Sequence, residues 1–145
     1  MNPQTSIPTL FGRGTAIFKE HDDLRPLVAR LREHATGLAL GRTPSDLDVE
    51  TLLDRFFDQL LAHFAAEENE GYFGTVVEDY PTLSVQVERL MAEHEDMVDA
   101  VERLRVLAEQ PARTRDLGLG LLELFGQFEG HEQEESILMR TFMSK

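Results

Sequence analysis

The sequence predicts an all-α fold, an up-down-up-down antiparallel four-helix bundle. Three observations favour it: 145 residues suffice for one domain with its own core, helical periodicity is strong in four segments, and no β pattern of any length appears. Proline and glycine separate the four segments and leave only short connections, which favour antiparallel neighbours. We therefore expect an N-terminal arm over residues 1–14 and a single bundle domain over residues 15–145.

Each of the four segments carries core-facing residues at alternating spacings of three and four, the pattern of a helix that buries one face in a bundle. We call each such row a seam. In chain order the seams are Ile17, His21, Leu24, Val28, Leu31 and Ala35; Val49, Leu53, Phe56, Leu60, His63 and Glu67; Val87, Leu90, His94, Val98 and Val101; and Leu117, Leu121, Leu124, Phe128, His131, Glu135, Leu138 and Phe142. Every seam contains one histidine, which should face the core.

The four seam histidines are the strongest functional signal in the chain. A single histidine on an apolar helix face is more often a buried residue satisfied by a hydrogen bond than a ligand. A strict seam takes about two positions in seven, so four histidines fall there by chance on the order of once in a hundred. In alternating antiparallel helices all four can meet in one layer, toward one end of the bundle.

Two seam carboxylates strengthen this signal. Glu67 follows His63 by four residues and Glu135 follows His131 by four, so each pair shares one helix face. Burying an unpaired carboxylate costs several kcal/mol, and two of them beside four imidazoles require compensating positive charge. A pair of divalent or trivalent cations would supply it. The predicted metal ligands are His21, His63, Glu67, His94, His131 and Glu135.

Composition narrows the possible chemistry. The chain has no cysteine, so disulfides and thiolate sites are excluded and only histidine and carboxylate remain as strong metal ligands. The formal net charge of −13 should repel nucleic acid and anionic membranes, so neither is an expected partner. No apolar run predicts a membrane span, and the N-terminal sequence does not resemble a signal peptide. We expect a cytoplasmic protein whose partner is a small molecule.

Other conspicuous residues have ordinary interpretations. The fifth histidine, His34, lies beside the first seam and is expected at the surface or at its boundary. Tyr72 and Tyr80 are expected in a loop after the second helix, where loop packing is favoured over hydrogen bonding to the metal site. Four glycines interrupt the last helix: Gly118, Gly120, Gly126 and Gly130. The last two, Gly126 and Gly130, are placed to let a neighbouring helix or a small ligand approach His131.

The histidine motifs resemble those of a known family. Residues 63–68, HFAAEE, resemble the HFxxEE motif on the second helix of hemerythrins, and residues 131–135, HEQEE, resemble the HxxxE motif of the HHE cation-binding branch. His21, followed by aspartate, stands where the family places a ligand on its first helix. His94 stands where it places one on the third. The resemblance covers roughly residues 15–142.

The resemblance implies a non-haem di-iron centre with an oxo or hydroxo bridge. By position, Glu67 and Glu135 would bridge the two irons, and the four seam histidines would be terminal ligands. Oxygen-carrying hemerythrins have a second histidine on the third helix, but this chain has Leu90 and Val98 around His94. A poorer nitrogen set favours ferric iron and reaction with oxygen, peroxide or nitric oxide over reversible oxygen carriage. A catalase-like or peroxidase-like activity would fit such a site.

The resemblance leaves other functions open. A replacement ligand for the missing histidine could come from Glu68, Glu93 or Glu95, although solvated helix faces are the favoured interpretation of these residues. An iron or oxygen sensor, or an iron store, would use the same ligands without catalysis. A metal-free helical interaction module with incidental histidines is the remaining, least favoured, alternative.

Overall fold

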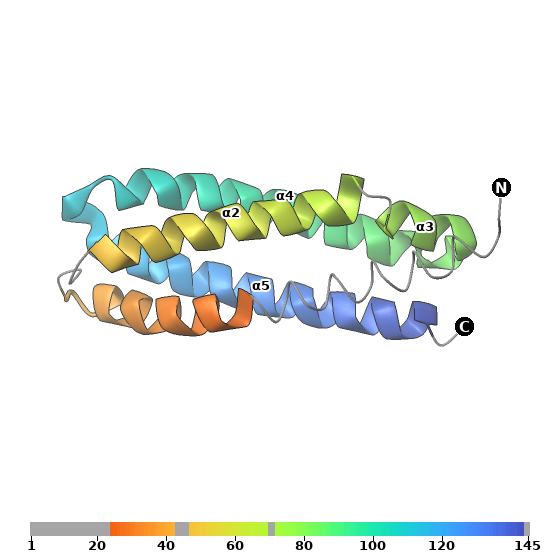
Figure 1. Cartoon of the computed structure of the whole chain (residues 1–145), viewed down its shortest axis with the longest axis horizontal. Helices are drawn as coiled ribbons and strands as arrows, with labels where there is room; N and C mark the ends of the chain where they lie inside the picture. Colours follow the sequence, from red (N-terminus) through yellow and green to blue (C-terminus); the bar gives the residue numbers. More distant parts are fainter. Residues whose placement is uncertain (1–23, 43–46, 70–71, 144–145) are drawn as a thin grey trace.

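The protein is described by a computed structural model covering residues 24–42, 47–69 and 72–143. Four long helices run through it: residues 24–39, α2 (Leu47–Asn69), α4 (Ser84–Ala108) and α5 (Thr114–Met143). Successive long helices reverse direction along the long axis of the molecule, and the described residues contain no strand (Figure 1). The predicted up-down-up-down four-helix bundle is confirmed. The predicted arm over residues 1–14 lies outside the described residues, so this boundary stays a prediction.

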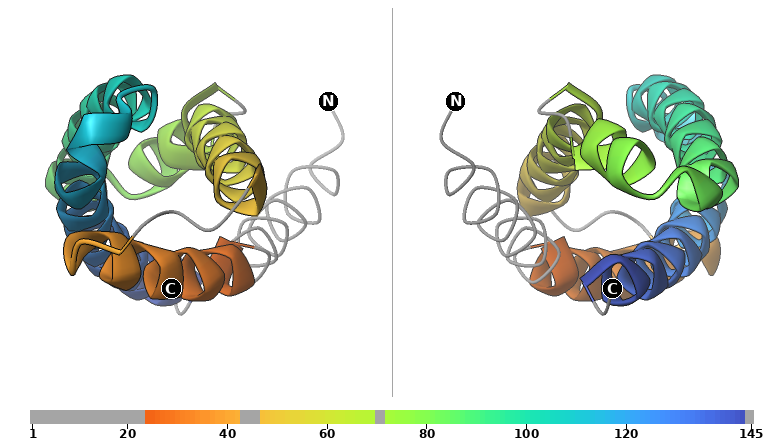
Figure 2. Two further views of the ribbon diagram at one scale, coloured as in Figure 1. Left: turned by 90° about the vertical axis from the view of Figure 1, so that its left-hand side faces the viewer. Right: turned by 90° about the vertical axis from the view of Figure 1, so that its right-hand side faces the viewer.

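The seams form the interior of the bundle. Within the described ranges every predicted seam residue is buried except Val98, which is half-buried against the core. Ile17 and His21 lie outside the described residues. Seen end-on, the four long helices surround a common centre, as Figure 2 shows. The alternating three-and-four spacing therefore identified the inward face of each helix.

Two apolar clusters lie along this interior. The main core fills the end at which α4 connects to α5 and includes Phe56, Phe125 and Phe128. A second core at the opposite end includes Phe73, Leu90 and Leu138. None of the helices in the described ranges is long and apolar enough to cross a membrane.

The segment after α2 was predicted as a loop, and this prediction is wrong. Tyr72 begins a short helix, α3 (Tyr72–Asp79), which a 3₁₀ turn (Pro81–Leu83) connects to α4. Phe73 and Val76, three residues apart, bury one face of α3 in the second core. Tyr80 follows α3, and its ring packs edge-on against Phe142 at 5.3 Å between centroids, in line with the packing role expected for it.

The glycines of α5 fall into two groups. A Cβ at Gly118 would lie 2.5 Å from the backbone nitrogen of Ala39, so this glycine permits close contact with the helix over residues 24–39. A Cβ at Gly120 would meet the Leu104 side chain at 2.6 Å. At Gly126 and Gly130 no atom of the described residues would lie within 4 Å of a Cβ, so no helix of the described part approaches them. Within the described residues, therefore, no helix uses the space at these last two glycines, and the alternative of a small ligand stays a prediction.

Candidate metal centre

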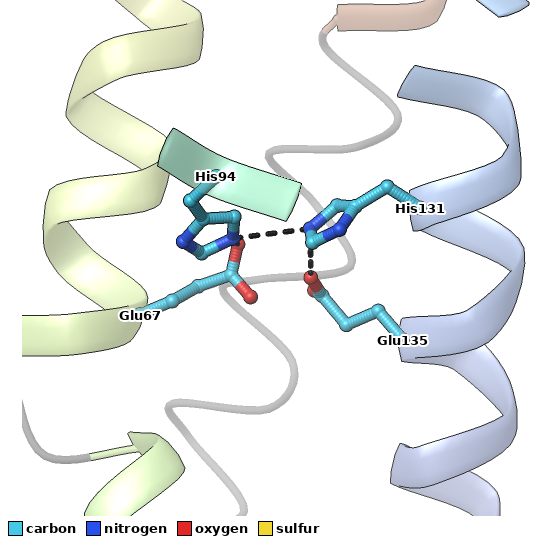
Figure 3. Close-up of side chains that lie close together, drawn as sticks. All are labelled: Glu67, His94, His131 and Glu135. Atoms are coloured by element: carbon cyan, nitrogen blue, oxygen red, sulfur yellow. Dashed lines mark hydrogen bonds and ion pairs between the residues drawn. The ribbon is translucent and has the colours of Figure 1, made fainter. Parts of the chain in front are cut away.

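Four of the predicted ligands converge in the interior. Glu67 from α2, His94 from α4, and His131 and Glu135 from α5 each place one ligand atom within 4.8 Å of the others. Figure 3 shows their side chains pointing toward one another from these three helices. All four residues are at most 2% exposed. We call these four residues the cluster; its neighbours along the helices belong to the main core on one side and the second core on the other.

Local helix geometry explains how the sequence builds the cluster. His131 and Glu135 are four residues apart on α5, so both side chains leave the same face, and the His131 Nε2 lies 3.2 Å from a Glu135 oxygen. His94 Nε2 lies 3.0 Å from His131 Nε2 and 3.6 Å from a Glu67 oxygen. Imidazole nitrogens and carboxylate oxygens thus meet at short range within a site closed to solvent.

His63 adjoins the cluster. Its Nε2 lies 2.8 Å from Glu67 Oε1, one turn along α2, and 3.9 Å from Glu135 Oε1 on α5. It is 2% exposed. Five of the six predicted ligands therefore lie in one buried layer, and the sixth, His21, lies outside the described residues. His34 is half-buried on the helix over residues 24–39, in agreement with the boundary position predicted for it.

Two aromatic rings enclose His94. The Phe64 ring stacks on the His94 imidazole at 4.1 Å between centroids with an interplanar angle of 16°, and Phe73 lies 5.6 Å away at 27°. Phe64 belongs to the same histidine motif as His63, whereas Phe73 comes from α3. The unexpected helix α3 therefore supplies one wall of the site and fixes the plane of the His94 ring.

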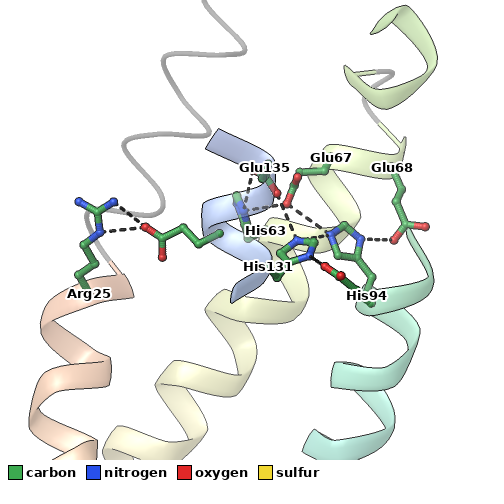
Figure 4. A network of polar contacts seen from close by, with 9 residues as sticks. Arg25, His63, Glu67, Glu68, His94, His131 and Glu135 are labelled. Atoms are coloured by element: carbon green, nitrogen blue, oxygen red, sulfur yellow. Dashed lines mark hydrogen bonds and ion pairs between the residues drawn. The ribbon is translucent and has the colours of Figure 1, made fainter. Parts of the chain in front are cut away.

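Two carboxylates outside the cluster lie within hydrogen-bond distance of the imidazole Nδ1 atoms, on the side of each ring that faces away from the cluster. Glu68 Oε2 lies 3.0 Å from His94 Nδ1, and Glu93 Oε1 lies 2.8 Å from His131 Nδ1. Figure 4 shows Glu68 reaching His94 from the next helix. Both side chains are about one-third exposed, at 33% and 30%. Glu68 and Glu95 are exposed, as expected for solvated faces, whereas Glu93 is half-buried. Glu68 and Glu93 nevertheless each contact one imidazole, which the sequence did not predict.

The electrostatic surroundings of the two histidines differ. Burial lowers the pKa of His94 to about 3, and the neighbouring His131 adds to this effect. Burial also acts to lower the pKa of His131, but hydrogen bonds and charge from Glu135 and Glu93 outweigh it, so this pKa is raised. In the absence of a cation, His131 therefore holds a proton far more readily than His94.

Two further contacts were missed by the sequence analysis. Glu132, only 8% exposed, accepts a hydrogen bond of 2.9 Å from Arg25 Nε and connects α5 to the helix over residues 24–39. A hydrogen bond to Glu93 raises the pKa of Glu134, which is half-buried. Neither pair follows from spacing along one helix, because each joins residues on different helices.

The comparisons with known proteins agree with this geometry. Residues 15–142 match the family model of the hemerythrin HHE cation-binding domain. Searches of the curated proteins and of the solved structures found no match. The matched range covers most of the chain and contains every member of the cluster. The chain therefore belongs to the hemerythrin HHE cation-binding domain family.

Proposed function

We propose that this chain is a non-haem di-iron protein that reacts with oxygen species: dioxygen, peroxide or nitric oxide. Glu67 and Glu135 are the proposed bridging carboxylates, because their oxygens lie among the imidazole nitrogens of the buried layer. The remaining ligands are the seam histidines, His21 among them by its place in the sequence. The full proposed ligand set is His21, His63, Glu67, His94, His131 and Glu135.

The observation that carries the proposal is the inward direction of acceptor atoms. An ionised carboxylate accepts hydrogen bonds only, so a neutral imidazole bound to it through Nδ1 carries its proton on Nδ1. His94 and His131 both have such a carboxylate partner, at 3.0 Å and 2.8 Å. Their Nε2 lone pairs then face each other at 3.0 Å, with Glu67 and Glu135 oxygens alongside. A cation is the partner that satisfies all of these groups at once.

The donor set favours two iron ions over one zinc ion. Structural zinc takes four ligands in tetrahedral geometry and very often includes cysteine, which this chain lacks. The buried layer offers five side chains from the described residues alone, with two carboxylates central to them. Mixed imidazole and carboxylate donors suit iron, and their oxygen content favours the ferric state. When bound, iron supplies redox chemistry toward oxygen, peroxide and nitric oxide.

A pocket between α4 and α5 lies beside the cluster along both helices, and none of the four cluster residues lines it. It has a volume of about 200 Å³, and Leu90, Glu134 and Leu138 are among its lining residues. Leu90 lies one turn before His94, and Glu134 and Leu138 flank Glu135 along α5. A molecule of a few atoms fits this volume.

Anaerobic mixing of the iron-loaded, reduced protein with each oxygen species tests the proposal. We expect repeated consumption of peroxide and binding of nitric oxide. We expect no reversible oxygen uptake, because this chain has Leu90 and Val98 around His94 and lacks the second histidine of oxygen-carrying hemerythrins. The His94→Ala variant is the matched control and should lose these reactions. Inertness toward all three molecules, or reversible oxygenation without autoxidation, would contradict the proposal. A single turnover per iron would indicate the sensor or storage alternative.

A further inference from the structure

We infer that Glu68 and Glu93 are positioning residues for His94 and His131. Each carboxylate keeps the proton of its imidazole on Nδ1, so that the unprotonated Nε2 faces the cluster and is free to bind metal. The inference deepens the proposed function and rests on it for its physiological meaning. It assigns a role to two carboxylates that, by sequence alone, are either solvated residues or replacement ligands.

The contacts place both carboxylates on the outer edges of the rings. Glu68 meets Nδ1 of His94, and Glu93 meets Nδ1 of His131, whereas the Nε2 atoms of the two rings meet each other. Nδ1 and Nε2 point in diverging directions from an imidazole, so a carboxylate on Nδ1 lies away from the cluster. Neither residue is therefore in place to replace the missing histidine as a ligand.

The arrangement connects three helices in sequence. Glu68, next to Glu67 on α2, reaches His94 on α4; Glu93, next to His94 on α4, reaches His131 on α5. The imidazoles are at most 2% exposed, whereas the carboxylates are about one-third exposed at 33% and 30%. Both carboxylates therefore keep part of their hydration, while their hydrogen bonds reach into the closed site. Burial and the charge of Glu95 raise the pKa of Glu68, and ionised Glu68 accepts a hydrogen bond from His94 Nδ1.

The physical effect is on orientation and basicity. A free neutral imidazole exchanges its proton between the two nitrogens, and rotation about χ2 exchanges their positions. A carboxylate fixed at Nδ1 selects one tautomer and one ring orientation, and it increases electron density at Nε2. Removal of such a hydrogen-bond partner typically lowers metal affinity by about 10-fold to 100-fold.

Imidazole ¹⁵N NMR of the full-length, metal-free protein at alkaline pH tests the inference directly. In the wild type both histidines should show protonated Nδ1 and unprotonated Nε2. Glu93→Ala should give a tautomer mixture at His131 and leave His94 unchanged, and Glu68→Ala should do the reverse. Glu93→Gln should restore the wild-type tautomer, because the amide oxygen can accept the same hydrogen bond. Glu95→Ala, also next to His94 but exposed, is the matched control. The charge of Glu95 raises the pKa of Glu68, so its removal favours ionised Glu68 and should leave both rings in the wild-type tautomer.

Zinc binding to the same metal-free variants provides the second measurement. We expect affinity to fall about 10-fold to 100-fold in each alanine variant, less in Glu93→Gln, and not in Glu95→Ala. Unchanged tautomers in both alanine variants, or equal zinc loss in Glu95→Ala, would overturn the inference. If tautomers respond as stated but the protein takes up no iron, the proposed function fails alone. If iron binds normally and the tautomers do not respond, only the positioning role fails.

Discussion

The Nε2 atoms of His94 and His131 lie 3.0 Å apart, although the two residues come from different helices. Burial lowers the pKa of His94 to about 3, whereas Glu135 and Glu93 raise that of His131 against the effect of burial. In the metal-free protein a proton therefore binds more readily to His131 than to His94. A metal ion competes with this proton for the same lone pairs.

The first prediction concerns the acid stability of the metal-free protein. His94 has an ordinary pKa near 6.5 when unfolded and about 3 when folded, so the unfolded chain binds the extra proton between these values. The free energy of unfolding should fall as pH drops from about 6.5 toward 3, by up to about 1.4 kcal/mol per pH unit from this residue. Urea titrations of wild type and His94→Gln across this window measure the difference. Equal slopes in the two proteins would contradict the assignment.

The opposite sign applies to His131. Its folded pKa is raised, so the stability that it contributes is fully present below its unfolded value of about 6.5 and is lost as pH rises through the raised value. Its contribution is therefore constant in the acid window and does not obscure the effect of His94. NMR titration of the two rings in the metal-free protein should show His131 deprotonating at the higher pH. Identical titration midpoints would be inconsistent with the different surroundings of the rings.

Metal removal should lower the melting temperature markedly. The buried layer holds three imidazoles and two carboxylates within the described residues, and a bound cation stabilises only the folded state. At metal concentrations 100-fold above the dissociation constant the stabilisation is about 2.7 kcal/mol, which corresponds to roughly 5–10 °C for a chain of this size. Calorimetry before chelation, after chelation and after iron is restored measures it. A melting temperature that chelation leaves unchanged would show that the polar layer is stable without metal.

Alanine substitutions of two neighbouring glutamates on α5 test which of them is a metal ligand. Glu135 is fully buried with an oxygen 3.2 Å from His131, so Glu135→Ala should lose at least one iron per chain. Glu134 lies about 100° around the same helix and contacts Glu93 instead, so Glu134→Ala should keep the iron content. His34→Ala should also keep it, and His94→Ala should not. Equal metal loss in the two glutamate variants would mean that the wrong face of α5 was assigned to the site.

A pair of glycine substitutions tests the packing of α5 independently of metal. In Gly118→Ala the new Cβ would meet Ala39 backbone at 2.5 Å, so the helices must separate, at a cost of about 1–3 kcal/mol. In Gly126→Ala the methyl meets no atom of the described residues within 4 Å, and helix propensity should stabilise the protein by up to about 1 kcal/mol. Denaturant titration of both variants gives the comparison. Equal effects would contradict the close approach of the helix over residues 24–39.

Seam periodicity predicted the fold and most of the site because both depend on position along a single helix. Spacings of three and four placed His94 and His131 inward without knowledge of their partners. The eight residues of α3 are too few to show the same periodicity over several turns. Its burial depends on the second core, which only the assembled bundle provides.

The hydrogen bonds around the site depend on contacts between helices. Glu68 and Glu93 each sit beside a predicted ligand, about 100° around the helix, which by sequence looks like a solvent-facing position. Only the approach of the adjacent helix brings the ring of His94 or His131 within reach. The bond between Arg25 and Glu132 likewise joins residues 107 positions apart in the chain. Sequence spacing carries no information about such pairs.

The iron content of protein purified in air from cells tests the central claim most directly. Elemental analysis should find close to two irons per chain, with ferric absorption in the near ultraviolet. The result follows from the six proposed ligands, two of them carboxylates set among imidazoles in a closed layer. One zinc per chain without such absorption, or no bound metal in protein that also fails to take up added iron, would contradict the account.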